Sequence, residues 1–79
     1  MLFSRNEKQV AQMHFIEGLS ASKIEQRGVS RGTFTRARRQ ILVVLKTVGI
    51  NTDCPRDVSE ALAVLLRRQD AIESQAVAA

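Results

Sequence analysis

Hydrophobic residues along this chain recur at intervals of three and four, the spacing that places them on one side of an α-helix. Four segments follow this pattern, and glycines or capping residues separate them. No segment alternates apolar and polar residues as a half-buried strand would. The pattern therefore predicts an all-α fold, a small four-helix bundle that contains a helix-turn-helix, in one domain over residues 1–69.

The first helix is predicted over about residues 4–17, and a capping signal marks its start. Ser4 and Glu7 have the spacing of a capping box, in which each side chain bonds to the free backbone amide of the other residue. We therefore expect the helix to begin directly after Ser4. Its apolar side consists of Val10, Ala11, Met13, Phe15 and Ile16.

A second helix over about 21–27 and a third over about 31–48 flank a predicted tight turn. Gly28 lies where the chain must turn sharply, because glycine adopts a positive φ at little cost. Ser30 supplies a side-chain oxygen for the first amides of the third helix, and Gly49 marks its end. The third helix has an inward stripe made of Phe34, Ala37, Ile41, Leu42 and Leu45.

A fourth helix is predicted over about 55–69, because the fixed φ of Pro55 suits a first helical turn. Its apolar residues exceed what a short helix needs to complete a three-helix core. They either complete the core of one chain or also pair with a second copy, and both alternatives stay open. The residues expected at such a dimer interface are Val58, Leu62, Leu65 and Leu66. Residues 70–79 lack packing partners in this scheme and are expected to fray.

The charge of the chain is unevenly distributed, although the formal net charge is only +4 at pH 7. Residues 1–52 hold nine lysines and arginines against three acidic residues, whereas residues 53–79 hold three against five. Four of the arginines fall between positions 31 and 39, on the third helix. This basic segment indicates a polyanionic partner; the alternative is an ordinary solvated surface.

The third helix is predicted to enter the major groove of double-stranded DNA. The planar fork of arginine matches the two acceptors of guanine, so Arg36 and Arg31 are the candidates for direct base readout. The other members of the set are expected at neighbouring bases or at phosphates. The full set is Arg31, Thr33, Thr35, Arg36, Arg39, Lys46, Lys23, Arg27 and Lys8.

The remaining residue types argue against other function classes. Cys54 and His14 are the single cysteine and histidine of the chain, so we expect no disulfide, no metal site and no His-based catalysis. The sequence contains neither a catalytic pair of nucleophile and general base nor a glycine-rich phosphate-binding loop. We therefore expect no enzyme activity and no cofactor. The N-terminal segment lacks the apolar run of a signal peptide, and no stretch is long enough to span a membrane. We therefore expect a cytoplasmic protein.

Short motifs along the four predicted helices form a further pattern. They are Phe3-Ser4 with Glu7, Glu17-Gly18-Leu19-Ser20, Ile24, Val29-Ser30, Gly32-Thr33-Phe34, and Ile41-Leu42 with Leu45, Gly49 and Ile50. With these motifs, residues 3 to about 66 resemble the DNA-binding domain of LuxR-type (GerE-like) regulators and, more loosely, the promoter-reading region of sigma factors. Arg38 stands where the LuxR-type family usually has an apolar residue. The resemblance implies a regulator that works as a homodimer through its fourth helix.

Two functions from different classes follow from these observations. The first is a sequence-specific regulator of transcription that binds double-stranded DNA with its third helix; the resemblance implies that a partner or its own expression level controls it. The alternative is an adaptor or anti-activator that binds another regulatory protein, in which case the basic third helix meets an acidic protein surface. A shift of duplex DNA from the upstream region of its own gene separates the two.

Overall fold

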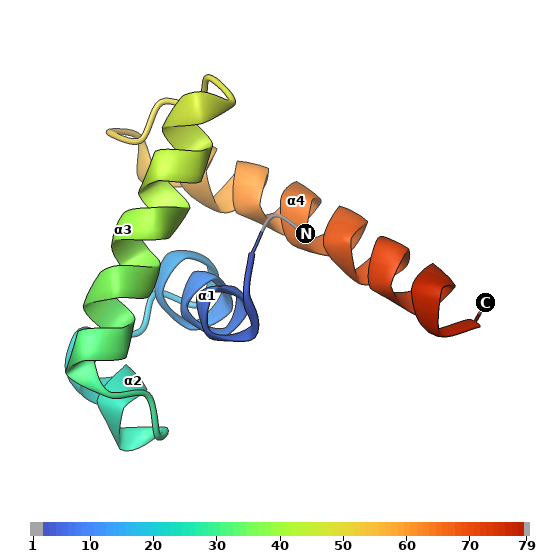
Figure 1. Cartoon of the computed structure of the whole chain (residues 1–79). Coiled ribbons are helices and arrows are strands. Elements are labelled where there is room, and N and C mark those ends of the chain that lie inside the picture. The colour runs from blue at the N-terminus through green and yellow to red at the C-terminus, as the bar shows by residue number, and fades with distance from the viewer. Residues whose placement is uncertain (1–2, 79) are drawn as a thin grey trace.

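The computed structural model describes the backbone of residues 3–78 and the side chains of residues 3–75. Within this part of the chain every regular element is helical, which confirms the all-α prediction (Figure 1). None of these helices has the length and apolar character needed to cross a membrane. The elements are α1 (Arg5–Val10), the π-helix η1 (Ala11–Ile16), α2 (Ala21–Gln26), α3 (Arg31–Thr47) and α4 (Pro55–Ala78).

The first predicted helix is two elements, α1 and η1, so the expectation of a continuous α-helix is wrong in its second half. Its start is as predicted, because Ser4 and Glu7 form the reciprocal capping box. Beyond Val10 the hydrogen bonds span a wider turn; the amide of Glu17, for example, donates to the carbonyl of Gln12 at 2.9 Å. This wider turn helps Met13, Phe15 and Ile16 to contact the core from nearly consecutive positions, which the narrow face of an α-helix does not favour.

The second and third helices and the turn between them agree with the sequence prediction. Ser20 caps α2, and Ser30 caps α3 by accepting the amide of Thr33 at 3.2 Å. Gly28 has a φ of +99°, in the left-handed region that favours glycine. Together α2, this turn and α3 form the helix-turn-helix, in which α2 and the start of α3 lie at one end of the molecule and α3 extends toward the start of α4 (Figure 1).

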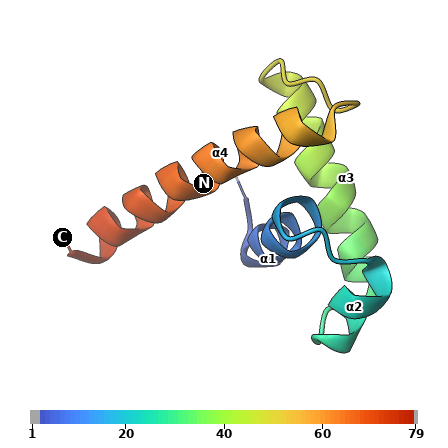
Figure 2. The same cartoon turned by 180° about the vertical axis from the view of Figure 1, so that it is seen from behind.

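Helix α4 is longer than predicted, because it continues past Gln69 to Ala78. No glycine or proline follows Pro55, so nothing in the sequence stops the helix earlier. The expectation that residues 70–79 lack a packing partner is also wrong for two of them. Asp70 and Glu73 both form ion pairs with Lys8 of α1. The end of α4 projects beyond the other helices in both views (Figures 1 and 2).

One shared core lies where α1 and η1 pack against α3 and α4. It contains three of the four predicted dimerisation residues, because Val58, Leu62 and Leu66 are all buried within the single chain. Leu65 is half-buried against the same core. The prediction of a dimer interface is therefore corrected for Val58, Leu62 and Leu66, which α4 uses to complete the core. For Leu65, which keeps part of its surface exposed, it stays a prediction. The buried apolar residues are Phe3, Val10, Ala11, Ile24, Val29, Phe34, Ala37, Ile41, Leu45, Val58, Leu62 and Leu66.

Candidate nucleic-acid interface

The core contacts of α3 determine which of its side chains face solvent. Phe34 and Ile41 are buried, at 8% and 0% exposed, as the sequence pattern predicted. Arg36 and Arg39 lie on the other side of the helix and are exposed. Helix α3 contains no aspartate or glutamate, so nothing within the helix neutralises its cations. One side of α3 is therefore packed and the other is cationic.

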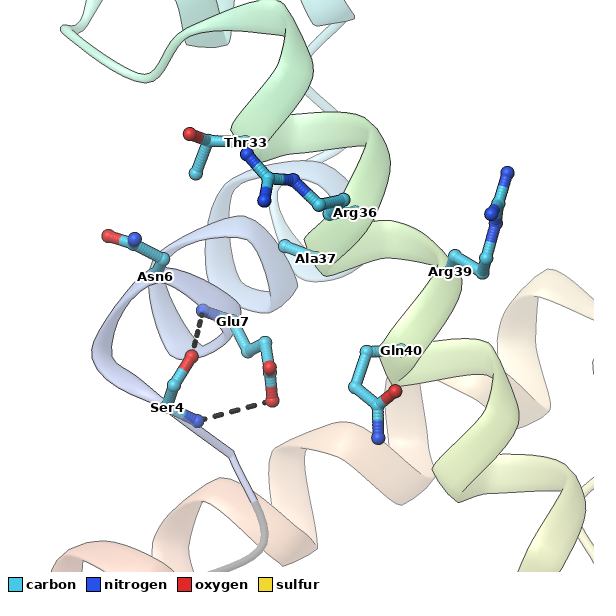
Figure 3. Close-up of a pocket in the computed structure, with 8 residues that line it drawn as sticks. All are labelled: Ser4, Asn6, Glu7, Thr33, Arg36, Ala37, Arg39 and Gln40. Atoms are coloured by element: carbon cyan, nitrogen blue, oxygen red, sulfur yellow. Dashed lines mark hydrogen bonds between the residues drawn. The ribbon is translucent and has the colours of Figure 1, made fainter.

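An open groove of about 490 Å³ lies between the start of α1 and the middle of α3 (Figure 3). Arg36 and Gln40 border it from α3, and Glu7 borders it from α1. The carboxylate of Glu7 accepts the amide of Ser4 at 3.2 Å in the capping box. The full lining is Ser4, Asn6, Glu7, Thr33, Arg36, Ala37, Arg39 and Gln40.

Arg36 and Arg39 are the cations of α3 best placed to meet an external anion. Among the side chains of residues 3–75, neither forms an ion pair. Both border the groove of Figure 3, where the side chain of Arg39 extends away from the helix. A guanidinium without an ion-pair partner keeps its full hydrogen-bonding fork for a carboxylate, a phosphate or a guanine.

Arg31, the second candidate for guanine readout, already has a partner within the chain. Its Nε lies 3.1 Å from Oε2 of Glu25 in α2. Both side chains are more than half exposed, so the pair contributes little to stability. It does occupy one edge of the guanidinium and braces α2 against α3 across the turn. Of the two arginines, only Arg36 is therefore without an ion-pair partner among the side chains of residues 3–75.

The two threonines predicted at the interface use their hydroxyl groups inside α3. The Thr35 hydroxyl donates to the carbonyl of Arg31 at 2.9 Å. The Thr33 hydroxyl accepts from the Ser30 hydroxyl at 2.8 Å and forms part of the helix cap. These hydroxyl groups stabilise the start of the helix. The methyl groups of the two threonines form no hydrogen bond and have no part in this cap.

The remaining predicted cations are spread over several parts of the surface. Lys23 and Lys46 are exposed and form no ion pair within residues 3–75. Arg27 borders a different hollow, next to α4, and not the groove of Figure 3. The predicted phosphate contact of Lys8 is corrected, because its Nζ lies 2.9 Å from Glu73 and 3.1 Å from Asp70. These hydrogen bonds, the one to Glu73 first, raise the pKa of Lys8.

Arg38, the position that departs from the LuxR-type pattern, lies on the opposite flank of α3 from the groove. It borders a hollow of about 560 Å³ together with Lys46 and His14. His14 is a core-edge imidazole: Nδ1 lies 2.9 Å from the carbonyl of Leu19, and its ring meets the Phe34 ring edge-on at 5.0 Å. At this edge of the core Arg38 remains exposed.

Four polar residues of the groove were absent from the predicted site: Ser4, Asn6, Glu7 and Gln40. The signal for Gln40 was present in the sequence, because it follows Arg36 by four residues and so lies on the same side of the helix. Asn6 comes from another helix, and only the tertiary structure brings it to this groove.

Residues 3–75 contain no group of three or more histidine, cysteine or acidic side chains arranged to hold a metal ion. Cys54 is half-buried directly before α4, where its carbonyl accepts the amide of Val58 at 3.1 Å. This cysteine thus has the structural role of a residue at a helix start.

Comparison with known proteins does not add to this description. No model of a known protein family matches the chain, and neither a curated protein nor a solved structure matches it.

Proposed function

We propose that this protein is a sequence-specific regulator of transcription that binds double-stranded DNA through α3. The observation that carries the proposal is the exposed, unneutralised side of α3, with Arg36 and Arg39 at its centre. The helix has 17 residues and is about 25 Å long at 1.5 Å per residue. The major groove of DNA, about 12 Å wide, admits a helix of this kind.

The aromatic residues favour a double-stranded partner over a single-stranded one. Single strands are commonly bound by stacking bases on exposed aromatic rings. Phe3 and Phe34 are buried, and Phe15 is half-buried against the core. The described chain therefore presents cations without a stacking surface, the combination suited to a duplex whose bases remain stacked.

The neighbouring elements support the same docking. Ile24 of α2 and Phe34 of α3 are buried in the same core, so the two helices meet the duplex as one unit. Lys46 lies further along α3, where it is suited to contact a phosphate beside the major groove of the DNA. Lys23 in α2 is suited to a phosphate on the other side of the turn.

Fluorescence anisotropy with two duplexes tests this proposal. The first duplex is selected by the protein from a random library, and the second is its scrambled sequence. Arg36→Ala should remove most of the preference for the selected duplex, because one arginine to guanine contact contributes about 1–3 kcal/mol of discrimination. Arg67→Ala, on α4, removes the same charge and should keep the preference. An unchanged affinity ratio in Arg36→Ala, or a parent protein that binds neither duplex at moderate salt, contradicts the proposal.

The proposal includes a homodimer, formed by a face of α4 other than the predicted one. Glu60, Val64, Arg68 and Ile72 follow one another at intervals of four residues and are all exposed. The side chain of Val64 therefore lies between an acid and a base on one row of the helix. Two copies of α4 packed antiparallel about Val64 place Glu60 of each copy opposite Arg68 of the other. Such a dimer presents two α3 helices to a site with two-fold symmetry.

A further inference from the structure

Gln40 occupies a position on α3 that the proposed function has not used. It is exposed, it borders the same groove as Arg36, and it follows Arg36 by one helical turn (Figure 3). Its neighbours Ala37 and Ile41 point into the core, which fixes the direction in which Gln40 leaves the helix. Within residues 3–75 its side-chain amide forms no hydrogen bond to protein.

The chemistry of this side chain complements that of Arg36. A glutamine amide offers one donor and one acceptor side by side, which match the N7 acceptor and the N6 donor of adenine in the major groove. The arginine fork offers donors only and matches the two acceptors of guanine. Two residues on one face of a helix can therefore distinguish two different bases.

The spacing of the two residues sets the spacing of the two bases. Four residues of an α-helix advance by about 6 Å, and successive base pairs are about 3.4 Å apart. A helix that follows the major groove thus carries Arg36 and Gln40 past bases separated by about two steps.

We infer that Gln40 is a specificity-determining residue that reads an adenine about two base pairs from the guanine contacted by Arg36. This inference rests on the proposed DNA binding. It adds the identity of a second base, its distance from the first, and a residue that recognises it.

The test uses modified bases in the duplex selected by the parent protein. Replacing adenine by 7-deazaadenine removes the N7 acceptor but keeps the Watson–Crick pair, and 7-deazaguanine does the same for guanine. The parent protein should lose roughly tenfold or more in affinity when the adenine read by Gln40 is replaced, as expected for one bidentate contact. Gln40→Ala should bind the modified and unmodified duplexes equally, and Arg36→Ala should show the same insensitivity at the guanine.

Gln9→Ala is the matched control, because Gln9 is an exposed glutamine that borders a different hollow, on the α4 side of α1. It should remain as sensitive to 7-deazaadenine as the parent. The inference is overturned if Gln40→Ala keeps the sensitivity of the parent at every adenine, or if the sensitive adenine is not about two steps from the guanine. If Arg36→Ala also keeps its preference for the selected duplex, the proposed function itself fails, so the two failures are distinguishable. Circular dichroism of Gln40→Ala should match the parent, since the side chain is exposed.

Discussion

Gln69 of α4 binds both polar backbone groups of Phe3, which lies 66 positions earlier in the chain. The amide of Phe3 donates to Oε1 of Gln69 at 3.1 Å, and Nε2 of Gln69 donates to the carbonyl of Phe3 at 2.7 Å. Both residues are buried. The glutamine thus acts as a backbone partner for a segment outside any regular element, so the Phe3 ring enters the core without leaving unsatisfied polar groups behind it.

Gln69→Ala should therefore destabilise the domain. The substitution leaves the amide and the carbonyl of Phe3 without partners, at a cost of about 1–3 kcal/mol for a buried unsatisfied group. Urea unfolding followed by circular dichroism measures the change. Gln75→Ala replaces an exposed glutamine on the same helix and should change the free energy of unfolding by less than about 0.5 kcal/mol. Equal effects of the two substitutions would contradict the role assigned to Gln69.

Phe34→Ala should destabilise the domain more strongly, although its neighbours in the sequence are residues proposed to contact DNA. Its ring is 8% exposed and meets the His14 ring edge-on. Removing a buried phenyl ring costs about 3–5 kcal/mol, a large part of the stability of a small domain. A thermal melt should show a lowered or absent transition. Val43→Ala, at a residue 50% exposed on the same helix, should melt close to the parent, and the assigned helix faces are wrong if the two variants behave alike.

The link between α1 and α4 should respond to acid. Lys8 and then Gln69 donate hydrogen bonds to Glu73 and lower its pKa below the ordinary value of 4.5. A carboxyl with a lowered pKa in the folded state stabilises it at pH values above the unfolded pKa, and this contribution is lost as the pH falls through the folded pKa. Glu73→Gln should therefore be less stable than the parent at pH 7, and the difference should shrink in acid. A difference that stays constant across this range would show that the carboxylate charge has no part in the link.

Lys46 should contribute affinity without sequence preference. As a phosphate contact, its replacement by alanine should weaken binding to the selected and the scrambled duplex by similar factors. The slope of log affinity against log salt concentration should fall by about 0.9 to 1. Anisotropy titrations at several salt concentrations measure both quantities. A loss confined to the selected duplex would instead place Lys46 at a base.

Charge reversal tests the proposed α4 dimer. Glu60→Arg places arginines opposite each other across the interface, and Arg68→Glu does the same with acids, so each variant alone should sediment as a monomer. An equimolar mixture should restore the dimer, because the two basic positions of the first variant then face the two acidic positions of the second. Sedimentation velocity at tens of micromolar, with and without duplex DNA, decides between the outcomes. Single variants that dimerise like the parent would exclude this face of α4.

Local sequence signals determined where most helices begin and which side of α3 is polar. The Ser4 and Glu7 capping box, the Ser30 cap and the positive φ of Gly28 involve residues within a few positions of one another. Such signals act through backbone amides and φ angles nearby, so they can be recognised without the fold. The absence of acidic residues from α3 and the recurrence of its apolar residues at intervals of three and four are likewise properties of one segment. The role of Arg36 in binding remains a prediction from this pattern.

The tertiary structure decided which apolar faces are used and which charges are already paired. The sequence showed that α4 has an apolar stripe, but only the packing of α1 and η1 against it assigns Val58 and Leu62 to the core of one chain. The pairing of Lys8 with Glu73 joins residues 65 positions apart, and it removes a predicted phosphate contact. The widened turn of η1 brings the nearly consecutive side chains of Met13, Phe15 and Ile16 to this core. These outcomes depend on competition between distant partners for the same groups, which no local pattern in the sequence encodes.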